Sequence, residues 1–326
     1  MAKRHLTLLN SQGVIYAGII GNLLVAATKF VAALFTGSSV MMSEAIHSLV
    51  DTGNSLLLIY GIRRAKQLPD QTHPLGYSRE IYFWSFVVAV LVFALGAGIS
   101  LYEGIAHILN PELIQNALVN YIVLAISALF DGATWWLALR NFKGSLHYGA
   151  LFSKFKKSKD PTQFMVLFED TAALIGLIIA FAGTYFSIVL KMPVLDGIAS
   201  ILIAIVLATT AILLARETKG LLIGETADQV VIDSILKIAR SIPGIAHVNG
   251  ALTTQIGPAQ IIATLSLEFA DDLRTPEIEA IIIKLERQVR DHCPEVTALF
   301  VKPQTLFAHE KVMSTRFKGQ TGVIGN

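Results

Sequence analysis

Three ionisable residues share one face of a single apolar segment. Glu44, His47 and Asp51 lie in a hydrophobic stretch that runs from about Ser39 to Ile62. Their spacing along the chain puts all three side chains on the same face of an α-helix. An ionisable group in the core of a bilayer costs several kcal/mol unless it faces a partner, water or an ion. The pattern therefore indicates a polar path or a metal site inside a membrane.

The side-chain types match those that hold divalent metals. Imidazole and carboxylate groups bind Zn²⁺ and similar ions. His47 and Asp51 stand four residues apart, so one helical turn can chelate an ion between them. The alternative is that His47 forms a hydrogen bond with another span.

A second apolar segment carries two adjacent acids, Glu169 and Asp170. Neighbouring residues point ~100° apart on a helix. We therefore expect one of them to face the site and the other to face a nearby polar group. The alternative is a hydrated helix end, because Pro161 precedes Glu169 by only eight residues.

Two spans that supply carboxylates, one of which adds an imidazole, can complete a tetrahedral site. If all four ligands come from the protein, no position stays open for catalysis, so such a site binds an ion and releases it. Metal ligands must be deprotonated. Metal and protons then exclude one another, which is the basis of antiport.

The composition is that of a membrane protein with an additional domain. Of the 326 residues, 53% are hydrophobic and only 15% are charged, whereas soluble domains usually carry about 25% charged residues. The net charge of +2 gives no reason to expect a nucleic-acid partner. The single cysteine, Cys293, excludes an intrachain disulfide and a cysteine-based metal cluster.

Six segments have the length and apolar character of a membrane-spanning helix, which needs ~20 residues. We read the first as a retained helix rather than a signal peptide. The predicted spans cover approximately residues 13–35, 39–62, 80–105, 117–139, 163–187 and 194–216. Within them, Lys29 is expected to snorkel or to pair with a nearby acid, and Asn22, Glu103 and Asp131 to line a cavity or to bond between helices.

The connecting segments alternate in positive charge. Four segments, counting both ends of the predicted bundle, carry two or more Lys or Arg residues, whereas the three loops between them carry a single cation, Lys191. The positive-inside rule therefore places both termini in the cytoplasm. The cationic residues of the charged segments are Lys3 and Arg4; Arg63, Arg64, Lys66 and Arg79; Arg140, Lys143, Lys154, Lys156, Lys157 and Lys159; and Arg216 and Lys219.

The C-terminal third reads as a small α+β domain. Helical spacing at 228–241 and after residue 277, strand-like runs at 245–256 and 296–301, and strict alternation at 262–269 give the order α-β-β-α-β. We therefore predict an α-helical membrane protein with a six-helix transport domain at 1–217, a cytoplasmic ferredoxin-like dimerisation domain at 218–308 and a flexible tail at 309–326.

Six spans, His47 and Asp51 in the second, an acid in the fifth and this C-terminal domain together resemble the cation diffusion facilitator family. Residues 43–52 and 73–77 carry the most specific resemblance, closest to the branch that contains the animal mitochondrial zinc transporter. The resemblance implies export of divalent metals, usually Zn²⁺, by exchange for protons in a homodimer. It also implies that His47, Asp51 and Asp170 are metal ligands.

The chain departs from the family pattern at several positions. The usual first ligand of the fifth span falls on Val166, which cannot bind metal, so we expect Glu169, or alternatively Glu44 or water, to take its place. A second, weaker site in the loop keeps Asp70 and His73 but has Tyr77 at the last ligand position. Family ligand positions in the C-terminal domain fall on Asn249, Ser266 and Val301.

The leading functional hypothesis is a proton-coupled Zn²⁺ exporter that uses alternating access around a site near the membrane midplane. The other hypotheses are a passive metal channel and a membrane metal-binding or regulatory protein without transport. An enzyme is the least favoured reading, and no cofactor is expected. Mn²⁺, Co²⁺, Cd²⁺ and Fe²⁺ are alternative ions, and a bacterial inner membrane is the expected location.

Overall fold

The computed structural model describes residues 20–114, 116–141 and 159–316. It divides into two compact units, Met1–Gly220 and Leu221–Asn326. Both this division and the predicted one at residue 217 fall near the end of the same long helix, α8 (Val194–Ile223). Residues 13–19 of the first predicted span, the lysines at 143–157 and the tail after residue 316 lie outside the described residues.

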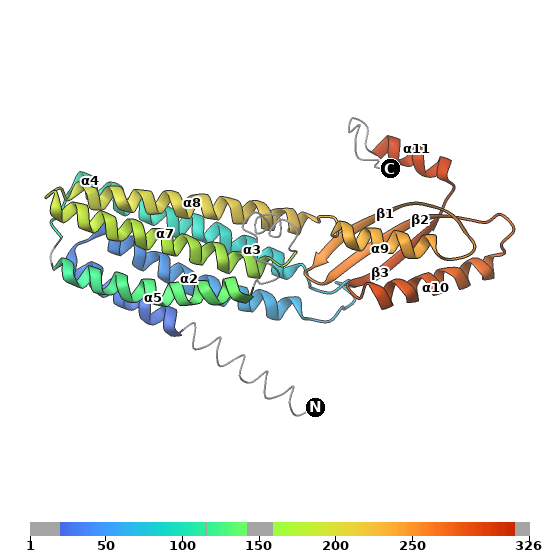
Figure 1. Ribbon diagram of the computed structural model, residues 1–326, viewed down its shortest axis with the longest axis horizontal. Helices are drawn as coiled ribbons and strands as arrows, with labels where there is room; N and C mark the ends of the chain where they lie inside the picture. Colours follow the sequence, from blue (N-terminus) through green and yellow to red (C-terminus); the bar gives the residue numbers. More distant parts are fainter. Residues whose placement is uncertain (1–19, 115, 142–158, 317–326) are drawn as a thin grey trace, which may run out of the picture. The chain divides into compact units, whose positions relative to one another are not determined.

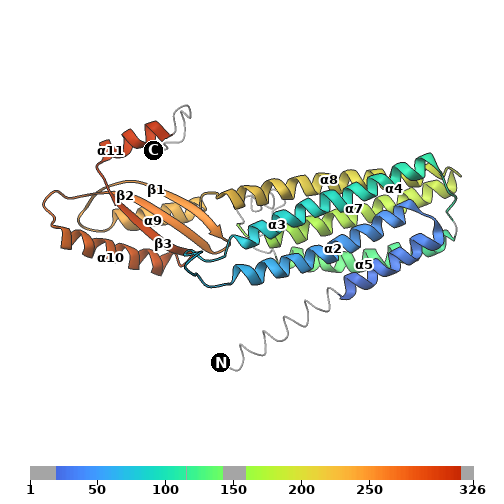
Figure 2. The ribbon, with the colours of Figure 1, turned by 180° about the vertical axis from the view of Figure 1, so that it is seen from behind.

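The first unit is a bundle of helices that run roughly parallel or antiparallel to one another (Figures 1 and 2). Each described helix of this unit falls on one of the six predicted spans. Before α8, they are Ile20–Thr36, α2 (Ser39–Ala65), the continuous run of α3 (Glu80–Leu91), η1 (Val92–Ala97) and α4 (Gly98–Leu109), α5 (Ala117–Asn141) and α7 (Pro161–Val189).

Four of these helical runs are long and apolar enough to cross a membrane: Glu80–Leu109, Ala117–Arg140, Phe164–Val189 and Val194–Ile223. The helix Ile20–Thr36 is apolar but shorter within the described residues. Helix α2 is long enough, but the polar side chains that it buries lower its hydropathy. The described residues thus establish a membrane protein of several spans, and six crossings stay a prediction.

Helix α2 packs against α3, η1, α4 and α7, and α7 packs in turn against α5. Small side chains such as Ala33, Ala172, Ala180 and Ala199 are frequent in the apolar core between these helices. Because lipid gives helices no hydrophobic reason to associate, small residues that permit close packing hold such bundles together. This packing fixes which face of α2 looks inward.

The second unit has helices α9 (Gln229–Arg240) and α10 (Thr275–His292) and a sheet of strand order β1-β2-β3. Strand β1 (Ile245–Gly257) pairs antiparallel with β2 (Gln260–Phe269), with Ala251 opposite Leu265. Strand β3 (Val296–Pro303) pairs parallel with β2, with Val301 opposite Leu265. The predicted order α-β-β-α-β is confirmed.

The core of this unit lies between the helices and one face of the sheet. Ala263, Leu265 and Leu267 alternate along β2 and are fully buried, against Ile235 of α9 and Leu285 of α10. The period-2 alternation that predicted this strand is therefore the pattern of its buried face.

Helix α11 (Leu306–Arg316) begins before the segment predicted as a flexible tail, 309–326, and covers its first residues. Its first turn is held by hydrogen bonds: the Ala308 amide donates to Thr305 Oγ1, and the Leu306 amide donates to a carboxylate oxygen of Glu268. These capping contacts, rather than apolar periodicity, define the helix, which is why the sequence pattern missed it.

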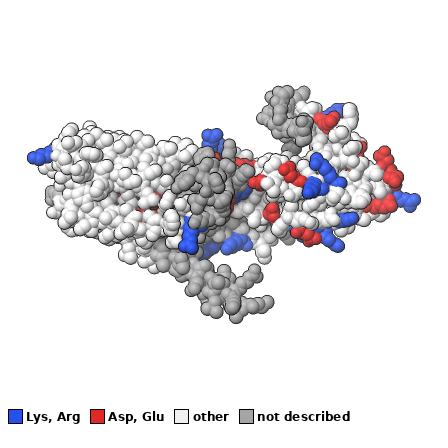
Figure 3. Space-filling view, in the orientation of Figure 1, with Lys and Arg blue, Asp and Glu red and all other residues white. Residues whose placement is uncertain are grey.

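The surfaces of the two units differ in composition. In the view of Figure 3, the side chains of the helical bundle are almost all uncharged, whereas those of the sheet-containing unit include many of both signs. An exterior with few charged side chains is what a lipid-facing surface of a helical bundle requires.

Candidate metal site

Helix α2 is positioned by a buried polar contact at its first turn. Ser38 caps the helix by accepting a hydrogen bond from the Met41 amide. Asp196 of α8 accepts hydrogen bonds from the hydroxyls of Ser38 and Ser39 and from the Val40 amide. A fully buried carboxylate thus ties the start of α2 to α8, which sets the rotation of α2 in the bundle.

With that rotation, the predicted face of α2 looks inward. Glu44 and His47 are fully buried, and the side chain of Asp51 is 23% exposed. The imidazole Nδ1 of His47 lies 3.4 Å from Oδ1 of Asp51. The two predicted ligands from one helical turn therefore lie side by side, as their spacing requires.

Helix α7 supplies the predicted acids of the fifth span. It begins at Pro161 after Asp160, whose carboxylate caps it by accepting from the Thr162 amide at 3.0 Å. Glu169 is buried, and its Oε1 accepts a hydrogen bond of 3.0 Å from the Asn54 amide group of α2. The side chain of Asp170 is less buried than that of Glu169. Glu169 is thus inside the bundle and not at a hydrated helix end.

A cavity of about 380 Å³ brings these elements together. Asp51 of α2, Asp131 of α5 and the pair Glu169 and Asp170 of α7 all line it. Both adjacent acids of α7 line the same cavity although neighbouring residues on a helix point in different directions. The wall of the cavity is therefore strongly acidic.

The cavity also tests two further expectations. Asn22 and Asp131 line it, as predicted from their polar character within spans. Val166 lines it too and presents an apolar side chain. Within the residues that the structure describes, no three His, Cys, Asp or Glu side chains stand close enough together to hold a metal ion. Binding an ion with this set requires the side chains of α2 and α7 to move closer together.

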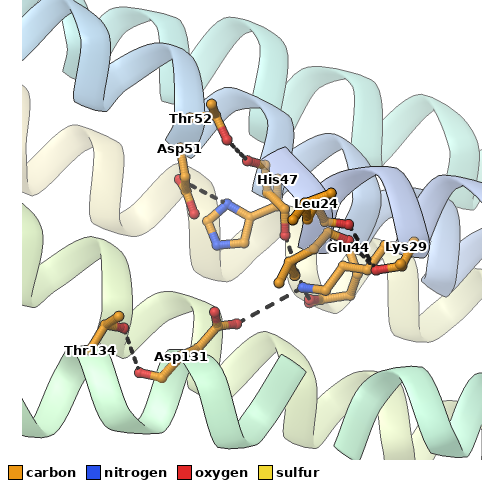
Figure 4. A network of polar contacts seen from close by, with 11 residues as sticks. Leu24, Lys29, Glu44, His47, Asp51, Thr52, Asp131 and Thr134 are labelled. Atoms are coloured by element: carbon orange, nitrogen blue, oxygen red, sulfur yellow. Dashed lines mark hydrogen bonds and ion pairs between the residues drawn. The ribbon is translucent and has the colours of Figure 1, made fainter. Parts of the chain in front are cut away.

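Glu44, the alternative ligand, has a different neighbour. Figure 4 shows Lys29 lying between Glu44 and Asp131. The ammonium group Nζ of Lys29 is 3.0 Å from Oε2 of Glu44 and 2.9 Å from the hydroxyl of Ser48. Lys29 is fully buried, so of its two predicted arrangements it adopts the pairing and not the snorkel.

Sequence reasoning missed Asn54 and Ser48. Asn54 follows Asp51 by one helical turn on the inward face of α2, and Ser48 adjoins His47. The same spacing that singled out the ionisable residues extends to these neutral polar side chains. They were missed because uncharged residues are common within apolar helices and carry a weaker signal.

The loop between α2 and α3 brings together Asp70 and His73, the predicted second site. The imidazole Nδ1 of His73 lies 3.6 Å from Oδ1 of Asp70. The Tyr77 hydroxyl donates to Oδ2 of Asp70 at 2.6 Å, and the Thr72 and His73 amides donate to Oδ1. The Tyr77 hydroxyl is therefore hydrogen-bonded to the carboxylate oxygen that a metal ion would need. These hydrogen bonds, with that of Tyr77 the strongest, lower the pKa of Asp70, and the bond to Asp70 raises the pKa of Tyr77.

In the C-terminal unit, two positions that the resemblance marks as ligand positions hold a structural hydrogen bond instead. The Asn249 amide group donates to the Ser266 hydroxyl at 3.2 Å and to the Gln304 carbonyl at 2.7 Å. Both bonds fasten β1 to its neighbours. These side chains are engaged in holding the sheet together.

Residues 15–223 match the family model described as the cation efflux transmembrane domain. This chain belongs to the cation efflux, or cation diffusion facilitator, family. The matched residues include all the described helices of the bundle and its acidic cavity. The match confirms the resemblance drawn from the spans and from the motif of α2.

Members of the family with curated names include relatives in animals, plants and bacteria. The human mitochondrial proton-coupled zinc antiporter SLC30A9 is 32% identical over 74% of this chain and 43% of its own length. Metal tolerance protein C4 of Arabidopsis thaliana is 30% identical over 80% of this chain and 57% of its own length. The zinc transporter ZitB of Pectobacterium atrosepticum is 24% identical over 76% and 72%. The chain thus matches about half of the length of each of the first two.

These relatives bear out the predicted likeness to the branch with the animal mitochondrial transporter, and the names of the human and the bacterial relative describe transporters. Among solved structures, the nickel form of the MamM CTD covers 24% of this chain and 96% of its own, at 17% identity and a TM-score of 0.23. A score this low supports no argument about the fold.

Proposed function

We propose that this chain moves a divalent metal ion, with Zn²⁺ the favoured substrate, across a membrane in exchange for protons. The observation that carries the proposal is the cavity wall, which Asp51, Glu169 and Asp170 all line, with His47 beside Asp51. Relatives named as a proton-coupled zinc antiporter and a zinc transporter support the same choice. Mn²⁺, Co²⁺, Cd²⁺ and Fe²⁺ are alternative substrates, since carboxylates accept all of them.

Exchange follows from the chemistry of the ligands. A proton and a metal ion compete for the same lone pairs on an imidazole or a carboxylate. In the proposed cycle, the ion enters the cavity and displaces protons from His47, Asp51 and Asp170 as these groups close on it. A change to the opposite-facing conformation then exposes the site to the other side, where protons displace the ion.

For the fourth ligand, the positions of the two candidate acids favour Glu169 over Glu44. Glu169 lines the cavity with Asp51 and Asp170, whereas Glu44 is paired with Lys29. The amide group of Asn54 orients one oxygen of Glu169. We therefore propose a site of His47, Asp51, Glu169 and Asp170, in which Glu169 takes the place that Val166 leaves empty of a donor.

The wider arrangement is part of the same proposal. Six crossings with both termini in the cytoplasm agree with the positive charge of alternate loops. The C-terminal unit would then be cytoplasmic and would support a homodimer, and a bacterial inner membrane is the proposed location. Hydrogen-bonded Asn249 and Ser266 favour a dimerisation role for this unit over metal sensing.

Transport assays in vesicles test the proposal. The full chain is reconstituted, a pH gradient is imposed, and uptake of Zn²⁺, Mn²⁺, Co²⁺ and Cd²⁺ is followed. We expect gradient-dependent Zn²⁺ uptake that His47→Ala, Asp51→Ala and Asp170→Ala each reduce at least tenfold. Changes around a metal's ligands already cost about 10–100-fold. The exposed His292 of α10 provides a matched control, His292→Ala.

Each other outcome contradicts one part of the proposal. Unchanged uptake in all three variants excludes the assigned ligands. Wild-type uptake that does not respond to the gradient indicates a passive channel, and Zn²⁺ binding without uptake indicates a metal-binding or regulatory protein. Unaltered Zn²⁺ affinity in Glu169→Gln excludes Glu169 as the fourth ligand.

A further inference from the structure

Lys29 is the basic group at the centre of the polar network in the bundle (Figure 4). It lies in the helix Ile20–Thr36 and is 0% exposed. A buried ammonium group without oxygen partners is prohibitively costly. Its partners should therefore account for its position.

The partners of Lys29 form an oxygen cage contributed by two other helices. Glu44 and Ser48 of α2 lie 3.0 and 2.9 Å from Nζ, and Asp131 of α5 lies 4.0 Å away. Two carboxylates and a hydroxyl are hard oxygen donors, which suit a divalent cation such as Mn²⁺ as well as they suit an ammonium group. Asp131 also lines the acidic cavity, so the cage adjoins the proposed transport path.

Glu44 has unused capacity to bind a cation. Its second oxygen, Oε1, is buried and has no hydrogen-bond partner among the described residues. It faces α7 at Gly176, where an added Cβ would lie only 2.6 Å from it. Because Gly176 has no side chain, the Glu44 carboxylate fits against α7. Its Oε1 has no hydrogen-bond donor among the described residues and is free to bind a cation.

From these contacts we infer that Lys29 is a resident cation that fills a second ion position formed by Glu44, Ser48 and Asp131. The inference rests on the proposed function, because it concerns the ion path that this function requires. By filling the position, the ammonium group keeps Glu44 and Asp131 from holding a second divalent ion next to the transported one. Lys29 thereby restricts the path to the site at His47, Asp51, Glu169 and Asp170.

The alternative is that Lys29 only ties three helices together. Loss of a purely structural ion pair lowers stability but creates no ion site. The number of ions bound per chain therefore separates the two roles, and stability alone does not.

The test measures Mn²⁺ and Zn²⁺ bound to the purified full chain in detergent by equilibrium dialysis. The variants are Lys29→Met, which removes the charge at similar length, Lys29→Arg, which keeps it, and Lys29→Met with Glu44→Gln. We expect Lys29→Met to bind one more Mn²⁺ per chain than wild type. Lys29→Arg and the double variant should bind as many ions as wild type.

The inference is overturned if Lys29→Met binds no additional ion, or if the additional ion persists in the double variant. Where Lys29→Met does not fold, Lys29→Gln carries the same expectation, because it also removes the positive charge and its shorter polar side chain leaves the oxygens of Glu44 and Ser48 open to an ion. Failure of the proposed function is read separately, from wild-type chain that binds no Zn²⁺ or binds it equally well with His47→Ala.

Discussion

At the residue scale, Asn54 gives the clearest prediction. Its amide group is the donor to the buried Glu169 Oε1. Removing one partner of a buried hydrogen bond costs about 1–3 kcal/mol, more for a charged group. We expect Asn54→Ala to lower the free energy of unfolding by at least this amount and to weaken Zn²⁺ binding, as measured by thermal unfolding and by metal titration in detergent.

The control for Asn54 lies on the same cavity. Asn22→Ala removes an amide from the cavity wall without touching Glu169, so its Zn²⁺ affinity should match that of wild type. Equal affinities of Asn54→Ala and wild type would show that Glu169 needs no support from α2.

The sequence predicted residue contacts within one helix better than contacts between helices. His47 and Asp51 are neighbours because four residues separate them on α2, whatever the rest of the bundle does. The bond from Asn54 to Glu169 depends on the rotation of α2 relative to α7, which Asp196 of α8 helps to set. No spacing along the chain encodes such a rotation.

At the element scale, the loop between α2 and α3 is held by hydrogen bonds to the Asp70 carboxylate, so we expect its stability to depend on pH. The Tyr77 hydroxyl and the His73 amide hold the pKa of Asp70 below its ordinary value of 3.8. The folded loop favours the charged carboxylate, so this stabilisation is complete above the ordinary pKa and is lost as the pH falls through the lowered value. Tyr77→Phe should move the pKa of Asp70 up towards 3.8, as measured by NMR titration of the carboxyl carbon.

Thr72→Ala is the matched control for this loop. It keeps the backbone amide that donates to Asp70, so the pKa of Asp70 should stay at its wild-type value. An unshifted Asp70 in Tyr77→Phe would mean that the backbone amides alone hold the loop.

A second prediction at this scale concerns the crossing of α4 and α8. A Cβ at Gly104 would lie 2.8 Å from the Gly197 carbonyl oxygen, and a Cβ at Gly197 would lie 2.8 Å from that of Gly104. The helices touch backbone to backbone, so an added methyl group must push them apart. Gly104→Ala should lower the free energy of unfolding by about 1–3 kcal/mol, as measured by thermal unfolding in detergent.

Gly132 of α5 serves as the control, since a Cβ there would meet nothing within 4 Å. Gly132→Ala should leave stability unchanged or raise it by about 0.5–1 kcal/mol, because alanine loses less backbone entropy in a helix. If Gly104→Ala lowers the free energy of unfolding no more than Gly132→Ala does, α4 and α8 can separate without loss of stability.

The elements themselves followed from sequence where apolar periodicity was strong. The alternation of Ala263, Leu265 and Leu267 located β2, and the apolar runs located the helices of the bundle. The π-helical turn η1 within the third run was not predicted, because Val92–Ala97 is as apolar as its flanks and a change in hydrogen-bonding register leaves no mark on composition.

At the scale of the whole molecule, the two units have separate cores. The core of the C-terminal unit includes Leu265, Leu285 and Cys293, and the proposed ligands all lie in the first unit. Loss of packing in one unit therefore should not alter binding in the other. The single cysteine offers a way to test this independence in the intact chain.

Cys293 is 3% exposed, and burial raises the pKa of its thiol, so it reacts slowly with a thiol reagent until its unit opens. Leu265→Ala should destabilise that unit by about 2–5 kcal/mol. We therefore expect labelling of Cys293 in the full chain to accelerate at least tenfold, while Zn²⁺ affinity stays at the wild-type value. Conversely, His47→Ala should weaken Zn²⁺ binding and leave the labelling rate unchanged. If Leu265→Ala also weakens Zn²⁺ binding, the units are energetically coupled, and the C-terminal unit takes part in setting the metal site.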